Sequence, residues 1–161
     1  MPGAPRYFGQ AETTIDAKNR ITLPAKFRGK LPASPDGPIL LFVVPGAEFR
    51  HLDLFDSESG MERVNALTGA TGLPDATQRS RQNLLKTLEQ VECDRQGRIL
   101  LPRKHVEWAR LSGAVIVAGA GDHMQLYTAA EAKAADALAD IDELDPSNIG
   151  KLYDTALKKP Q

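Results

Sequence analysis

The sequence predicts an α+β fold in which one unit, a hairpin followed by a short helix and further strands, occurs twice. The main observation is a repeated stretch. I-D-A-K-N-R-I-T-L-P-A-K from Ile15 to Lys26 has the pattern of C-D-R-Q-G-R-I-L-L-P-R-K from Cys93 to Lys104. β-branched and apolar residues flank each loop, which favours strands. A proline follows each copy, and proline is favoured in the first turn of a helix.

Each copy has the features of a tight hairpin. Asp16 opens a polar loop that ends at Asn19, and Asp94 and Gly97 hold the same two positions in the second copy. Asn and Gly adopt a positive φ most readily, as the last residue of such a loop often must. An aspartate at the start can accept hydrogen bonds from loop amides. We therefore expect these four residues to shape the hairpin tips.

The elements that follow each hairpin come in the same order in both halves. The first half predicts a helix at 25–30, strands at 39–44 and 49–55, and a helix from Asp56 or Ser57 to Leu67. The second half predicts a helix at 103–110 ended by Gly113, strands at 114–118 and 124–127, and an Ala-rich helix that Thr128 caps and that reaches Leu138 or beyond.

A basic helix at 76–88 is predicted to connect the halves. Its spacing turns Leu84, Leu85 and Leu88 inward and Arg79, Arg81 and Lys86 outward. The expected organisation is a first repeat at 7–56, a helical linker at 57–90, a second repeat at 91–132, and a C-terminal helix and tail at 133–161. Residues 1–5 are expected to be a loose end, and the tail to be partly disordered or packed on a neighbour.

Composition and charge narrow the possible functions. The 161 residues carry a formal charge of -1, but six basic against two acidic residues lie in 1–30, and eight against four lie in 79–110. Both hairpins therefore sit in basic segments, and basic residues that share a face can bind nucleic acid. Acidic residues collect at 122–145, with seven against one basic residue.

Other classes of function lack their sequence signals. We expect no signal peptide, and the longest apolar run, 38–45, is too short to span a membrane. One cysteine, Cys93, fits a reducing cytoplasm, and we interpret it as a partly buried strand residue rather than a reactive thiol. The three histidines have no metal-ligand spacing, and no catalytic or nucleotide-binding motif occurs. Asp16 and Asp94 lack the context of an aspartic-protease pair. We expect no enzyme, no cofactor and no metal.

The chain resembles the MraZ family, a tandem relative of the AbrB-like, swapped-hairpin DNA-binding proteins. The resemblance rests on the two D-x-x-x-R copies that run into apolar-x-Leu-Pro, the Phe8-Gly9 opening, the basic helix around 79–85, and the V-x-V-x-G-x-G run at 115–121. It implies a swapped-hairpin β-barrel with a pseudo-two-fold axis. It also implies a sequence-specific transcriptional regulator of the division and cell-wall gene cluster. Such a protein binds direct repeats in double-stranded DNA as a ring, for example an octamer, in the cytoplasm and on the nucleoid.

The resemblance carries over to particular residues. Lys18 and Arg20 match the basic residues of the first motif, and Arg98 matches the second. The arginines are expected to contact base edges and Lys18 a phosphate. Further phosphate candidates are Lys26, Arg28, Arg103 and Lys104. Gln96 stands where the first copy has Lys18, so the two copies need not contribute equally.

Two alternatives remain open. An AbrB-type antitoxin would use the hairpins for DNA and the acidic segment at 136–145 to hold a protein partner. A purely structural ring would instead use the motif arginines in ion pairs with Asp16 or Asp94, and Arg20→Ala would then destabilise the fold.

Overall fold

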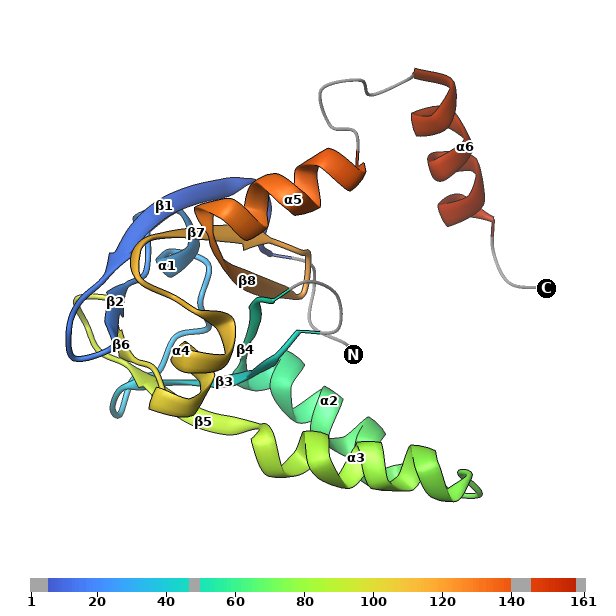
Figure 1. Cartoon of the computed structure of the whole chain (residues 1–161), viewed down its shortest axis with the longest axis horizontal. Helices are drawn as coiled ribbons and strands as arrows, with labels where there is room; N and C mark the ends of the chain where they lie inside the picture. Colours follow the sequence, from blue (N-terminus) through green and yellow to red (C-terminus); the bar gives the residue numbers. More distant parts are fainter. Residues whose placement is uncertain (1–5, 47–49, 140–145, 159–161) are drawn as a thin grey trace.

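The computed structural model describes residues 6–46, 50–139 and 146–158. This part of the chain contains eight strands, which come in consecutive pairs, and six helices (Figure 1). The first half contains β1 (Gln10–Ile15), β2 (Arg20–Thr22), α1 (Ala25–Arg28), β3 (Ile39–Pro45), β4 (Leu52–Asp56) and α2 (Ser57–Gly69). After α3 (Asp75–Thr87), the second half contains β5 (Glu89–Cys93), β6 (Arg98–Leu100), α4 (Arg103–Ala109), β7 (Gly113–Gly119), β8 (His123–Thr128) and α5 (Ala129–Ala139), and α6 (Pro146–Leu157) follows.

The strands form a closed antiparallel barrel in the order β1-β2-β6-β5-β3-β4-β8-β7. Each hairpin completes the other half of the barrel. β1 pairs with β7, where Thr13 lies opposite Val115, and β5 pairs with β3, where Val91 lies opposite Leu41. The α+β class and the swapped-hairpin barrel are therefore confirmed.

A pseudo-two-fold axis runs through two seams of the barrel. At the β2–β6 seam Ile21 lies opposite Ile99, its equivalent in the other copy. The loops exchange backbone bonds across this seam in the same symmetric way: the Leu23 amide donates to the Gly97 carbonyl at 2.7 Å, and the Leu101 amide donates to the Asn19 carbonyl at 2.9 Å. β4 and β8 form the opposite seam. The two motif copies thus meet side by side.

The core fills the barrel with inward-facing side chains from both halves. Ile21, Ile99, Leu52 and Leu126 are at most 1% exposed. Phe27 of α1, together with Val106 and Ala109 of α4, belongs to the same cluster. The Leu-Pro pair therefore has the same role in each copy. Its proline starts a short helix, and that helix contributes an apolar side chain to the core.

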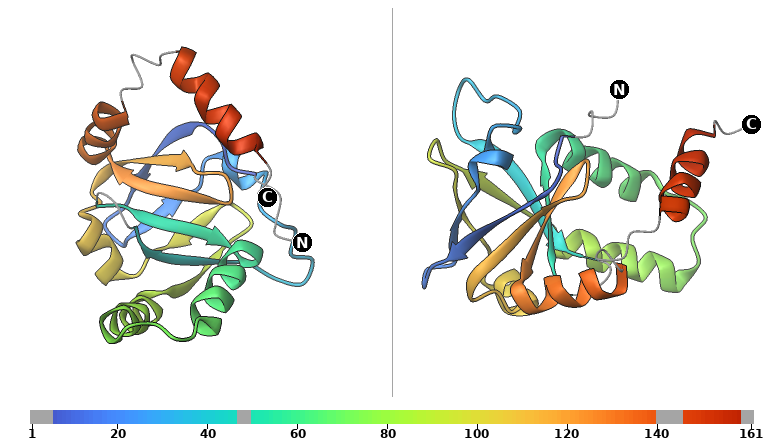
Figure 2. Two further views of the ribbon diagram at one scale, coloured as in Figure 1. Left: turned by 90° about the vertical axis from the view of Figure 1, so that its right-hand side faces the viewer. Right: turned by 90° about the horizontal axis from the view of Figure 1, so that it is seen from above.

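The longer helices differ between the halves. α2 packs on β3 and β4, and α3 brings Leu84 and Leu88 against an outer apolar cluster of Phe42, Val44 and Phe55. α5 packs on β7 and β8. α6 is drawn apart from the barrel in Figure 1 and in the right-hand view of Figure 2. The tail, predicted to be partly disordered or packed on a neighbour, contains the helix α6.

Three local expectations need correction. α1 ends at Arg28 rather than at residue 30, and a tight turn follows in which the Lys30 amide donates to the Phe27 carbonyl. α4 ends at Ala109 because Arg110, with φ 56°, takes a left-handed conformation; Gly113, which was predicted to end the helix, has φ 64° but lies beyond that end. Arg81 does not point outward. It is half-buried and donates to the Ala70 carbonyl at 2.7 Å, which holds the end of α2.

Both helix caps are confirmed. The Asp56 carboxylate accepts the Ser59 amide at 2.9 Å, and the Thr128 hydroxyl accepts the Glu131 amide at 3.1 Å. The expectations for residues 1–5, for Phe49 and for the acidic residues 140–145 lie outside the described residues.

Candidate nucleic-acid interface

The two hairpin tips have the same hydrogen-bond arrangement. One oxygen of the Asp16 carboxylate accepts the amides of Lys18 and Arg20, each at 2.9 Å. Asp94 accepts the amides of Gln96 and Arg98 at the same distances. The last loop residues have positive φ, 64° at Asn19 and 82° at Gly97. These contacts are the ones expected of loop-closing residues.

The second oxygen of each aspartate binds the motif arginine. Arg20 Nε donates to Asp16 at 3.0 Å, and Arg98 Nε donates to Asp94 at 2.8 Å. The arginine side chains remain 47% and 54% exposed, respectively. Hydrogen bonds from the backbone and from the arginine hold the pKa of each aspartate below its ordinary value. Each aspartate therefore stays ionised and orients an arginine toward solvent.

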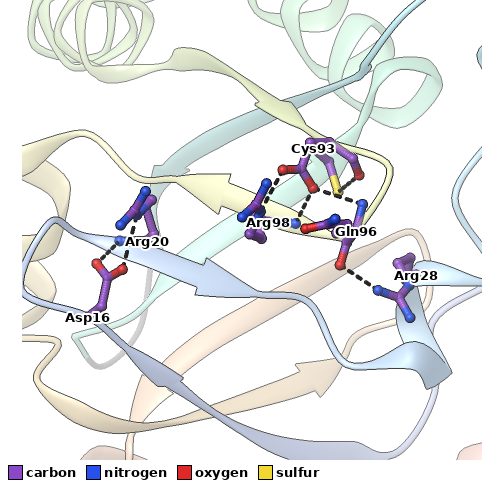
Figure 3. Close-up of polar contacts among 7 residues, drawn as sticks. Asp16, Arg20, Arg28, Cys93, Gln96 and Arg98 are labelled. Atoms are coloured by element: carbon purple, nitrogen blue, oxygen red, sulfur yellow. Dashed lines mark hydrogen bonds and ion pairs between the residues drawn. The ribbon is translucent and has the colours of Figure 1, made fainter.

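The register of the β2–β6 seam places both arginines on one surface. Arg20 lies opposite Leu100, and Arg98 lies opposite Thr22. Arg20 and Arg98 are thus diagonal neighbours, and such positions lie about 7–8 Å apart. Figure 3 shows them on adjacent strands, each beside its own tip. The sequence predicted two related tips, and the structure joins them into one surface.

A groove of about 740 Å³ lies along this seam. Arg20, Arg98 and Arg103 line it, so it collects three of the predicted DNA-binding residues. Glu92 and Asp94 line the same groove. Arg103 is 83% exposed and pairs with Glu107 at 2.8 Å along α4. The groove is hence a mixed surface on which the arginines are the outward cations.

The other predicted basic residues fall in different places. Lys18 is exposed at the first tip. Lys26 lies against Gly9, beyond the end of β1 that is farther from the tip. Lys104 lines a separate groove with Lys86 and His105.

Arg28 is directed at the second tip, where its guanidinium donates to the Gln96 carbonyl (Figure 3). Its side chain also packs against Gly97, where an added Cβ would stand 2.7 Å from the Arg28 Cδ. Arg28 therefore braces the second hairpin through a contact between the two halves. The residue in the matching place of the second half is Val106, so the first tip has no such brace from an arginine.

A cluster that the sequence did not reveal lies at the β4–β8 seam. Asp53 accepts a hydrogen bond from His51 at 2.8 Å and lies 3.5 Å from His123 Nε2. His123 Nδ1 is 2.7 Å from Asp122. Because the histidines are far apart in the chain, only the pairing of β4 with β8 brings them together.

The cluster shifts two pKa values. Burial opposes ionisation of Asp53, but hydrogen bonds from His123 and His51 outweigh it and lower the pKa to about 2. Burial likewise opposes protonation of His123, but hydrogen bonds to Asp53 and Asp122 raise its pKa above the ordinary value. The cluster is therefore a partly buried polar contact that joins the two halves.

Across residues 6–46, 50–139 and 146–158, no group of three or more His, Cys, Asp or Glu side chains could hold a metal ion. Burial, with the nearby charge of Asp94, raises the pKa of Cys93 to about 11, so the thiol stays protonated. Cys93 is 1% exposed, more deeply buried than predicted. No helix in the described part of the chain is long and apolar enough to cross a membrane.

Comparison with known proteins identifies relatives. Residues 84–137 match the family model described as "MraZ protein, putative antitoxin-like". The chain is 34% identical over 121 residues to the transcriptional regulator MraZ of Anaeromyxobacter sp. (strain Fw109-5), which covers 75% of this chain and 82% of the relative. The protein of the same description from Mycoplasmopsis pulmonis is 33% identical over 125 residues, 77% and 80% of the two chains. The one from Thiobacillus denitrificans is 29% identical over 143 residues, 88% and 95% of the two chains.

Proposed function

The chain belongs to the MraZ family of transcriptional regulators, which is not a family of enzymes, and on this premise we propose that it binds double-stranded DNA sequence-specifically through the β2–β6 seam. One observation carries the proposal. Arg20 and Arg98 lie on one exposed surface, and each is oriented by an ionised aspartate through Nε.

The chemistry of the arginines supports base contact. Within the described residues, each of these guanidinium groups is bonded through Nε, which leaves its two terminal nitrogens for another partner. A planar guanidinium can donate two parallel hydrogen bonds to guanine in the major groove. We expect Lys18 at the first tip and Arg103, which lines the groove, to contact phosphates, since such contacts fix the position of a protein on the duplex. Lys26, Arg28 and Lys104 lie farther from this surface or have structural contacts.

The solvent exposure of the two Arg–Asp pairs argues against the alternative in which the motif arginines are purely structural. The Arg–Asp pairs exist, as that alternative requires, but both partners of each pair are about half exposed. Exposed ion pairs contribute little to stability because water and salt screen them. We therefore expect Arg20→Ala to leave the fold intact.

We also propose, on energetic grounds, that the chain acts as a ring of subunits. One chain offers few DNA contacts, so its affinity should be modest and steeply dependent on salt. Several subunits on direct repeats upstream of the chain's own operon, in the division and cell-wall gene cluster, would raise the affinity through effective concentration. The chain would act in the cytoplasm, on the nucleoid. A monomeric variant with both motifs intact should bind weakly, and tight binding by such a monomer would contradict the need for a ring.

The test is DNA binding by fluorescence anisotropy across a salt series. The wild-type chain and an Arg20→Ala/Arg98→Ala variant are titrated with the upstream DNA and with a scrambled duplex, and circular dichroism checks that the variant folds. We expect the wild type to prefer the upstream DNA and the folded variant to lose that preference.

Two outcomes would overturn the proposal. A variant that binds like the wild type would remove the β2–β6 seam from DNA recognition. A wild type that does not distinguish the two duplexes at moderate salt would favour the purely structural alternative for the motif arginines, and the search would turn to protein partners.

A further inference from the structure

An apolar side chain, Leu100, lies next to both motif arginines. Leu100 is 60% exposed at the end of β6, although its chain neighbours Ile99 and Leu101 are buried. A single exposed leucine is common on protein surfaces and needs no explanation by itself. The position of Leu100, rather than its exposure, is what calls for an explanation.

The strand register fixes that position. Leu100 lies directly opposite Arg20 on β2, and it follows Arg98 by two residues on the same face of β6. The same three residues line the 740 Å³ groove. A ligand bound by both guanidinium groups would therefore rest on the Leu100 side chain.

We propose that Leu100 contacts the 5-methyl group of a thymine next to the base pairs that the arginines bind. The inference rests on the proposed DNA-binding function. Thymine is the base that presents a methyl group in the major groove, and apolar side chains recognise it by contact. Two arginine donors that each adjoin one apolar side chain match a site in which guanines neighbour a thymine.

The matching position of the first copy is different. Thr22 lies opposite Arg98 as Leu100 lies opposite Arg20, so the two residues are equivalents about the pseudo-two-fold axis. Threonine covers less apolar surface and can also form hydrogen bonds. Together with Lys18 and Gln96, this pair makes the two sides of the seam unlike. A surface with unlike sides binds DNA in one preferred orientation, as direct repeats require.

The charged surroundings favour DNA over a protein partner for Leu100. Arg20, Arg98 and Arg103 surround the groove, and the two motif arginines have outward donors. Glu92, beside Leu100 on the β5 side, limits the basic surface there. An apolar protein partner would have to cover three arginines, whereas a DNA groove supplies acceptors for them and a methyl group for the leucine.

The test removes single methyl groups from the DNA. Each thymine of the bound upstream duplex is replaced in turn by deoxyuridine, which lacks only the 5-methyl group, and affinity is measured by anisotropy at fixed salt. The proteins are the wild type, Leu100→Ala, Leu100→Thr to copy the first motif, and Leu157→Ala as a control. Leu157 is 78% exposed on α6, so its loss removes an exposed leucine elsewhere.

We expect one thymine position at which uracil weakens wild-type and Leu157→Ala binding about threefold to fourfold, the scale for one buried methyl group. At that position Leu100→Ala should bind both duplexes alike. Leu100→Thr should show a smaller loss than the wild type. All variants should keep the same salt dependence, because no phosphate contact has changed.

The failures can be told apart. If the wild type does not prefer the upstream duplex, the proposed function itself is wrong. If it does, but no thymine becomes insensitive to uracil when Leu100 is replaced, DNA binding stands and the role of Leu100 is wrong. If Leu100→Ala instead changes the sedimentation coefficient without changing the uracil response, Leu100 contacts protein and this inference is overturned.

Discussion

The two halves of the molecule share a backbone but differ at its surface. Both copies of the motif close their tips through an aspartate, start a short helix at a proline and cap a longer helix after β4 or β8. Their outward residues differ, with Lys18 and Thr22 in one copy and Gln96 and Leu100 in the other. The residues that set the backbone share one pattern, as do the two exposed motif arginines, whereas the other solvent-facing residues differ.

The outer layers differ too. In the first half, α3 places Leu84 and Leu88 on Phe42, whose counterpart on β7, Ile116, is half-buried. A duplicated fold therefore need not have duplicated surfaces. Differences between matched variants in the two halves can show which features belong to the common backbone and which belong to one side.

The largest difference is expected between the two helix caps. Asp56 is 1% exposed and accepts both the Ser59 amide and the Tyr7 hydroxyl, the latter at 2.7 Å. Asp56→Ala should lower the free energy of unfolding by about 3 kcal/mol, because a cap and a buried hydroxyl both lose their acceptor. Thr128→Ala removes a cap alone and should cost about 1 kcal/mol. Denaturant unfolding at one fixed protein concentration measures both.

A Tyr7→Phe/Asp56→Ala double variant is the control for the cap comparison. Removing the hydroxyl as well as its acceptor should recover part of the loss. Equal effects of Asp56→Ala and Thr128→Ala would show that the Tyr7 contact contributes nothing.

The next largest difference in the free energy of unfolding is expected between matched variants of the two hairpin tips. Gly97→Ala should cost about 2 kcal/mol, because φ is 82° and the new Cβ would meet the Arg28 side chain. Asn19→Ala should cost about 1 kcal/mol, since only the positive φ penalises it. Thermal and denaturant unfolding would measure both. Adding Arg28→Ala to Gly97→Ala should relieve the clash but not the backbone strain, and no relief would mean that Arg28 does not brace the tip.

The stability contributed by the histidine–aspartate cluster at the β4–β8 seam should depend on pH. The raised pKa of His123 makes its contribution to stability complete below about pH 6.5, the ordinary histidine value, and lost as pH rises through the folded value. The pKa of Asp53, about 2, makes its contribution complete above about pH 3.9 and lost as pH falls toward the folded value. Stability from this cluster should therefore be highest between about pH 4 and 6.5.

His123→Gln tests the pH dependence through unfolding curves at pH 6 and pH 8.5. The wild type should be less stable at the higher pH, and the variant should show less of this decline. Arg63, which lies 3.7 Å from Asp122, keeps that carboxylate paired in both proteins. An identical decline in wild type and variant would remove His123 as its source.

The smallest expected effect concerns the tip cations. If Lys18 contacts a phosphate, Lys18→Gln should weaken binding to all sequences a few-fold and reduce the slope of log affinity against log salt by about 0.9. Gln96→Lys should raise the slope by a similar amount, because it gives the second tip the same cation. Unchanged slopes would show that neither tip approaches a phosphate.

Local chemistry made much of this molecule predictable. Asp16, Asn19, Asp94 and Gly97 occupy tips because few residues close a short loop and accept positive φ, so their roles could be assigned from the chain alone. The prolines before α1 and α4 likewise marked helix starts. The barrel followed from the family resemblance, whereas periodicity alone predicted strands without their partners.

Contacts between distant segments were not predictable. His51 and His123 meet at Asp53 only because β4 pairs with β8, and no spacing in the sequence encodes that pairing. Arg28 and Arg81 resemble surface cations in sequence, yet both donate to backbone carbonyls. An arginine can satisfy a carbonyl as readily as a phosphate, and the distinction depends on tertiary neighbours.

The exchanged hairpins have a consequence for how the chain folds. Because β1 pairs with β7 and β5 with β3, neither half can close a barrel by itself, and Gln10 must find Ala118 across most of the chain. Such distant pairing is slow, since loop-closure entropy is lost before many contacts form. During synthesis β1 leaves the ribosome long before β7 exists. During synthesis, the edges of β1 and β3 therefore remain unpaired until the second half of the chain has been made.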